Sequence, residues 1–64
     1  MTPGKIYKHK AMKDVAFQII STTKFCDQLK VCGVWVNIAH KPYTHISPED
    51  IKIHFADLKK WEEV

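Results

Sequence analysis

Residues 29–39 read L-K-V-C-G-V-W-V-N-I-A, and this stretch decides the fold class. Its apolar residues alternate with other residues, which is the period-two pattern of a β-strand. The alternation changes phase at Gly33, because the inward position before it is Val31 and the inward position after it is Val34. A phase change at a glycine inside a strand is typical of a β-bulge, and bulges bend long strands in small barrels. The alternative is a flat central strand that is buried on both faces, with its tryptophan in the core.

Two further β-rich segments precede this strand. The first covers residues 5–10, with Ile6 as its strongest core candidate, and the second covers residues 15–23. The polar residues 24–28 that follow indicate a hairpin loop. Alternation in the second segment places one set of side chains on each face: Val15, Phe17 and Ile19 on one, and Ala16, Gln18 and Ile20 on the other.

The C-terminal part of the chain allows a helical interpretation. Ser47 and Pro48 are followed by two acidic residues, which is typical of a helix N-terminus. A helix over residues 48–62 would carry one apolar stripe. It would cover a three-stranded antiparallel sheet, and the fold class would then be α+β.

The same residues also allow a strand. Ile51, Ile53 and Phe55 alternate with polar residues. We favour this interpretation because it places all three apolar side chains on one face. Residues 57–61 then form a single helical turn, and residues 62–64 form a last short strand.

This pattern of strands resembles the SH3-like small β-barrels. Those domains have five short strands, a long bent central strand and one tight helical turn before the last strand. The resemblance extends over nearly the whole chain and is one of pattern, not of a sequence motif. It implies a mostly β fold, a small SH3-like five-stranded barrel with one short helical turn near the C-terminus, in a single small domain over residues 1–64.

Composition restricts the partners of such a domain. The net charge is +3, and all ten cationic residues are lysines. Arginine provides the planar fork that reads guanine edges, whereas lysine provides a flexible point charge. Sequence-specific reading of bases is therefore disfavoured, but attraction to a phosphate backbone is compatible with the composition.

The chain carries no feature of a membrane or secreted protein. It has no apolar run near the length of a transmembrane helix, and its first residues lack the apolar region of a signal peptide. Two cysteines are too few for a disulfide framework. We therefore expect a cytoplasmic protein with reduced thiols, and its short, lysine-rich sequence is typical of phage or AT-rich bacterial proteins.

The sequence predicts no catalytic centre, no cofactor and no metal site, so we expect a protein that is not an enzyme. The local signatures of catalytic cysteines and phosphate-binding glycine loops are absent. Cys26, Cys32, His40 and His45 are the only candidates for zinc. The cysteine spacing is wider than in structural zinc sites, and Cys32 lies inside an expected strand. A zinc-stapled domain is the third hypothesis.

Two basic segments with aromatic residues form the predicted binding surface. Lysines interleaved with rings suit single-stranded nucleic acid, because cations follow the phosphates and rings stack on bases. The alternative for the first segment is an edge strand whose lysines prevent aggregation. The predicted residues are Lys5, Tyr7, Lys8, His9, Lys10 and Lys13 in the first segment, and His40, Lys41, Tyr43 and His45 in a loop.

The resemblance to SH3-like barrels also implies protein binding through an aromatic groove. Tyr7, Trp35, Tyr43 and Trp61 are the rings available to line it, although both tryptophans are also candidates for the core. The leading hypothesis is therefore a non-enzymatic interaction module that binds a protein partner and modulates a larger machine. The alternative is weak, sequence-independent binding of nucleic acid through a lysine and aromatic face.

Overall fold

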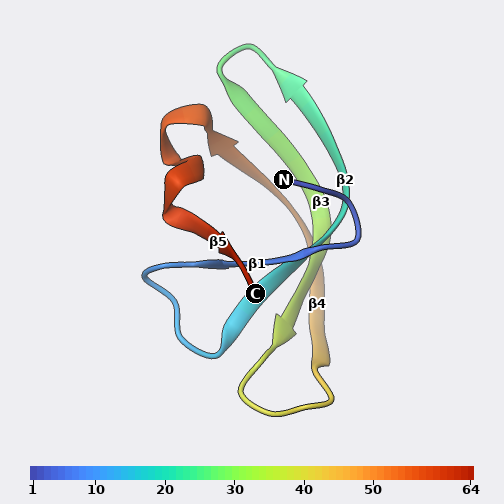
Figure 1. Cartoon of the computed structure of the whole chain (residues 1–64). Coiled ribbons are helices and arrows are strands. Elements are labelled where there is room, and N and C mark those ends of the chain that lie inside the picture. The colour runs from blue at the N-terminus through green and yellow to red at the C-terminus, as the bar shows by residue number, and fades with distance from the viewer.

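The computed structural model describes residues 1–64, which form five antiparallel strands and one short 3-10 helix (Figure 1). The predicted mostly β fold with one helical turn near the C-terminus is confirmed. The elements are β1 (Ile6–His9), β2 (Val15–Phe25), β3 (Gln28–Asn37), β4 (Thr44–His54), η1 (Phe55–Lys60) and β5 (Trp61–Glu63).

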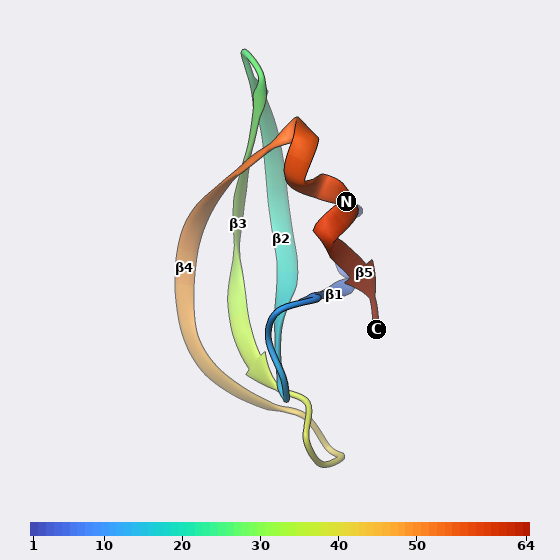
Figure 2. The ribbon, with the colours of Figure 1, turned by 90° about the vertical axis from the view of Figure 1, so that its left-hand side faces the viewer.

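The strands form one sheet in the order β4-β3-β2-β1-β5. Strands β1, β2 and β3 each pair with the next strand along the chain, and β5 returns to pair with β1. β4 and β5 each have one free edge, so the sheet is not a closed barrel. The sheet is strongly curved, and η1 and β5 lie on its concave side (Figure 2).

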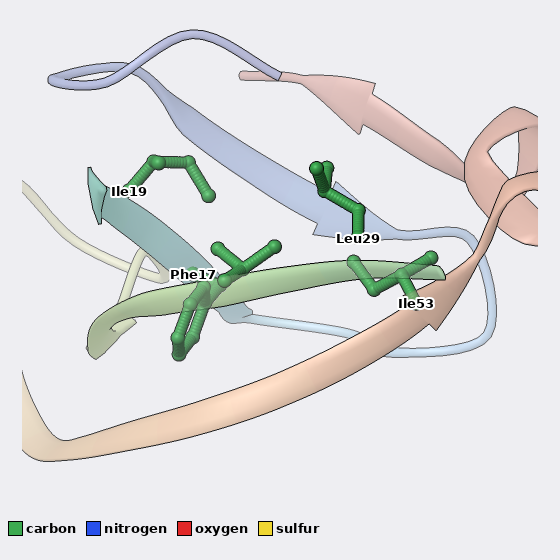
Figure 3. Close-up of a cluster of buried hydrophobic side chains, with 5 residues drawn as sticks. Phe17, Ile19, Leu29 and Ile53 are labelled. Carbon is green, nitrogen blue, oxygen red and sulfur yellow. The ribbon is translucent and has the colours of Figure 1, made fainter. Parts of the chain in front are cut away.

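The main core cluster lies on the concave face of the sheet. Its buried side chains come from three neighbouring strands, β2, β3 and β4 (Figure 3). Each such side chain contributes about 1.5–3 kcal/mol by leaving water. Ile6, the expected core residue of the first strand, is only half-buried. The core cluster consists of Phe17, Ile19, Leu29, Val31 and Ile53.

Gly33 lies in a continuous part of β3, and the bulge expected there is in the partner strand. β2 accommodates one extra residue, Ile20, opposite this glycine, and β4 has a second extra residue, Ile46. The glycine is needed for close approach: a Cβ atom at this position would lie 2.6 Å from the Phe17 ring and closer still to the carbonyl oxygen of Gln18. The bulge therefore accompanies a glycine, but the extra residue belongs to the neighbouring strand.

The segment from Ser47 onward belongs to β4, so the alternative helix over residues 48–62 is wrong. Pro48 is tolerated because β4 is an edge strand and one side of its backbone needs no partner. Ile53 is buried in the core, as the strand interpretation expects. Phe55 does not continue the alternation, since it begins η1 and its side chain is exposed.

The helical turn and the last strand both begin earlier than expected. η1 covers residues 55–60 and β5 begins at Trp61. His54 caps the helix, because its Nδ1 atom accepts a hydrogen bond from the backbone N–H of Ala56 at 3.1 Å. The cap explains why the helix begins as soon as β4 ends.

The expected loop over residues 24–28 is much shorter in the structure. β2 continues to Phe25 and β3 begins at Gln28, and these two residues pair with each other. Only Cys26 and Asp27 remain in the turn, and Cys26 adopts a left-handed backbone with φ of 55°. Polar residues in this segment belong to a long hairpin that extends beyond the core.

Candidate binding surfaces

The first predicted binding segment is not an edge strand. β1 lies between β2 and β5 and forms hydrogen-bonded pairs with both. The interpretation of its lysines as protection of a free edge is therefore wrong. As in any β-strand, the side chains of β1 alternate between the concave face and the opposite, outer face of the sheet.

The rings of this segment face the concave side and are held there. Tyr7 packs against the core cluster, and its hydroxyl accepts a hydrogen bond from the backbone N–H of Thr2 at 2.9 Å. The His9 ring lies edge-on to Trp61 with 5.1 Å between ring centroids. Its Nδ1 atom accepts a hydrogen bond from the backbone N–H of Ala11 at 3.0 Å. These rings therefore lie on the opposite face of the sheet from Lys8.

The lysines of this segment are dispersed. Lys5 lies 4.0 Å from the Glu63 carboxylate, and both side chains are more than half exposed, so this ion pair contributes little stability. Lys8 is half-buried on the outer face and donates to a backbone carbonyl at 3.4 Å. Lys10 and Lys13 are exposed in the connection to β2. The segment does not form the continuous lysine and aromatic face that the sequence predicts.

The second predicted segment is a loop only in part. His40 and Lys41 are exposed in the connection between β3 and β4, and Tyr43 is half-buried there. His45 is a strand residue of β4, which corrects its assignment to the loop. Its Nε2 atom lies 3.1 Å from the Oε1 atom of Gln18, so it crosses β3 on the outer face. The two connections lie side by side at one end of the sheet, because the backbone N–H of Ile38 donates to the carbonyl oxygen of Asp14 at 2.9 Å.

The structure instead forms a row of aromatic rings on the concave face, which we call the aromatic row: His9, Trp61 and Trp35. The two indole centroids are 6.4 Å apart, although their strands are far apart in the sequence. All three rings are half-buried, and Trp35 also packs on the buried Phe17 with 4.8 Å between centroids. The tryptophans thus both contact the core and expose part of their surface.

One carboxylate lies at the end of the aromatic row. The indole N–H of Trp35 donates to the Oε1 atom of Glu49 at 3.0 Å, and Glu49 is exposed on the edge strand β4. This bond orients the indole and places a negative charge beside it. Of the other rings considered for a groove, Tyr7 is tied to the N-terminus and Tyr43 lies outside this cluster.

A second surface lies on the outer face and was missed by sequence reasoning. It is a shallow cavity of about 250 Å³ near the tip of the β2–β3 hairpin, which we call the outer cavity. The residues that line it come from three strands and belong to no single motif, so only pairing of the strands assembles them. One local signal was present, since Phe25 is an aromatic residue within a polar stretch. The lining residues are Thr23, Phe25, Gln28, Lys30 and Lys52.

The cysteines and histidines considered for zinc are not brought together. No three His, Cys, Asp or Glu side chains lie close enough to share a metal ion, and both cysteines are free thiols. The pKa of the half-buried Cys32 thiol is raised, mainly by its hydrogen bond to the Asp50 carboxylate. This environment favours the protonated thiol, whereas metal binding and nucleophilic attack need the thiolate.

No helix of this chain has the length and apolar character needed to cross a membrane. A comparison with protein-family models, with curated proteins and with solved structures finds no match.

Proposed function

We propose that this chain is a non-enzymatic interaction module that binds a protein partner through the aromatic row. The observation that carries this proposal is the packing of three half-buried rings from β1, β3 and β5 on the concave side of the sheet. Aromatic side chains bury large areas on binding, and tryptophan is enriched among the residues that dominate interfaces.

The arrangement of strands supports the resemblance to SH3-like domains. β5 pairs with β1, the long strands β2 and β3 are bent, and a 3-10 helix directly precedes the last strand. That resemblance implies recognition of an extended, proline-containing segment between aromatic rings. The exposed Glu49 carboxylate beside Trp35 favours a cationic residue next to the prolines.

The aromatic row contains both tryptophans of the chain, so intrinsic fluorescence reports on it directly. The experiment titrates the protein with a short proline-rich peptide that carries lysines at its ends. A peptide of equal length and charge with glycine in place of proline is the control. We expect a saturable change of tryptophan emission with the proline peptide and a much weaker response to the glycine peptide.

Two variants separate binding at the row from a nonspecific effect. Trp61→Leu keeps an apolar contact with the core and removes one ring of the row, so we expect weaker peptide binding. Phe25→Ser changes an aromatic residue that lies outside the row, and we expect unchanged binding. A proline peptide that causes no saturable change, or that binds equally to both variants and to the original protein, would refute the proposal.

A further inference from the structure

We propose that the outer cavity is a binding site for single-stranded nucleic acid, in which Lys30 and Lys52 hold phosphates and Phe25 stacks on a base. The site differs in position from the aromatic row, because its residues alternate with core residues and face the opposite side of the sheet. The inference goes beyond the proposed function, since protein binding at the row neither requires nor predicts it.

The two lysines are held close together by strand pairing. Lys30 of β3 and Lys52 of β4 are direct partners in the register, which places Cβ atoms about 4.5–5.5 Å apart. Like charges at directly opposed positions destabilise a sheet. No carboxylate lies within 4.0 Å of either ammonium group, since the ion pairs of the chain involve other residues. An anion between the two lysines would remove this repulsion.

The acidic residues nearest to the cavity are engaged elsewhere. Asp50 lies two residues before Lys52 on the same face, and its carboxylate accepts a hydrogen bond from the Cys32 thiol. Asp27 at the hairpin turn lies 3.0 Å from the Nε2 atom of His54. Neither carboxylate lies within 4.0 Å of the Lys30 or Lys52 ammonium group, so both lysines remain unpaired although the surrounding surface is mixed.

Phe25 provides an apolar platform next to these charges. Its side chain is 70% exposed, which is the largest exposure among the large hydrophobic residues of this chain. A ring exposed to this extent contributes little to the core, so its surface is available to a ligand. Stacking on an aromatic ring tolerates every base, and the neighbouring Thr23 and Gln28 add polar groups at the same cavity.

The combination of a ring with paired lysines favours nucleic acid over an acidic peptide. Carboxylates of a peptide would satisfy the lysines but leave Phe25 unused, whereas a nucleotide presents a phosphate and a flat base together. Four of the five lining residues are exposed, which suits a strand that passes across the surface. The absence of arginine limits base recognition and indicates binding without sequence preference.

The experiment measures fluorescence anisotropy of a labelled oligothymidylate of about twelve nucleotides, within the range of site sizes of small single-strand-binding domains. An oligomer of equal length without bases and a polyglutamate peptide are the comparison ligands. With two phosphates neutralised at a slope of about −0.7 each, affinity should fall about 7-fold between about 50 and 200 mM salt.

Matched variants locate the site. Lys30→Gln with Lys52→Gln should remove most of the binding and its salt dependence. Lys10→Gln with Lys13→Gln removes the same charge from exposed lysines outside the cavity and should leave most of the affinity. Phe25→Ser should weaken binding by about 5-fold or more, as expected for the loss of one stacked base.

Three results would overturn this inference. The first is no binding of oligothymidylate at the lower salt concentration. The second is an equal loss of affinity in the two double-lysine variants. The third is binding of the base-free oligomer or of polyglutamate as tight as that of oligothymidylate. Circular dichroism of each variant establishes that the fold is retained. Tryptophan emission separates this site from the aromatic row: saturation with oligothymidylate should leave it unchanged, and a change that disappears in Trp61→Leu would assign the oligomer to the row and also refute the inference.

Discussion

Substitution of Gly33 by alanine tests the account of how β2 approaches β3. The added Cβ atom would lie 2.6 Å from the Phe17 ring and closer still to the carbonyl oxygen of Gln18. The ring belongs to a side chain that is only 1% exposed, and the carbonyl belongs to a paired strand, so neither can move without a loss of packing or pairing. We therefore expect a large decrease in the free energy of unfolding.

The magnitude follows from the rigidity of both neighbours. Insertion of one extra carbon into a filled core costs about 1–3 kcal/mol, and a backbone clash places this substitution near 3 kcal/mol. A chain of 64 residues has a total stability of about 3–10 kcal/mol at about 0.05–0.15 kcal/mol per residue. The melting temperature should then fall by about 12–24 °C, since a domain of this size loses about 4–8 °C per kcal/mol.

The assay is thermal and urea unfolding followed by far-ultraviolet circular dichroism. Gly4→Ala is the matched control, because Gly4 has nothing within 4 Å of an added Cβ atom but has a left-handed φ of 88°. It should cost about 1–2 kcal/mol through backbone strain alone. A Gly33→Ala protein that is as stable as the original, or more stable than Gly4→Ala, would show that close approach does not explain this glycine.

Two further substitutions test the outer face. Lys52→Glu places opposite charges at the directly paired positions 30 and 52. Urea unfolding should therefore show an increase of up to about 1 kcal/mol in the free energy of unfolding, and oligonucleotide binding should weaken. A loss of stability would contradict repulsion between Lys30 and Lys52. Because the hydrogen bond to Asp50 raises the pKa of Cys32, its alkylation should begin at higher pH than that of an unperturbed thiol, and Asp50→Asn should shift the profile to lower pH. Alkylation of Cys32 is measured in a Cys26→Ser background, so that only one thiol reacts. If Asp50→Asn leaves the dependence of alkylation on pH unchanged, Asp50 is not the cause of the raised pKa.

The two proposed binding surfaces lie on opposite faces of one sheet. The aromatic row is on the concave side, where η1 and β5 lie, and the outer cavity is on the other side near the hairpin tip. A partner at one surface therefore leaves the other accessible. This separation makes the two proposals independent, because the variants Trp61→Leu and Phe25→Ser each change one surface only.

Local sequence signals were least reliable where strand pairing opposed them. Ser47 and Pro48 match the start of a helix, but the segment pairs as β4 with the side of β3 that faces away from β2. The polar residues between Thr23 and Gln28 suggest a loop, but the long hairpin continues through Phe25. In both places, backbone hydrogen bonds to a neighbouring strand outweighed a local preference.

The position of the bulge shows a similar limit. The change of phase expected in β3 at Gly33 does not occur, and the extra residue is Ile20 in the neighbouring strand. A bulge depends on the pairing of two strands. The pattern of alternation in one strand therefore cannot show which of the two strands holds the extra residue. The same reason explains the outer cavity, because Lys30 and Lys52 are neighbours only through the register of β3 and β4.

Sequence patterns predicted the β-rich class, the long central strands, the shared face of Phe17 and Ile19, and a helical turn before the last strand. Alternation and β-branched composition are local properties, and the residues that carry them are adjacent in the chain. The tertiary structure alone decided that the sheet stays open, that β1 is internal, and that Trp35 meets Trp61. Those features depend on contacts between residues far apart in the chain, which only the pairing and curvature of the strands bring together.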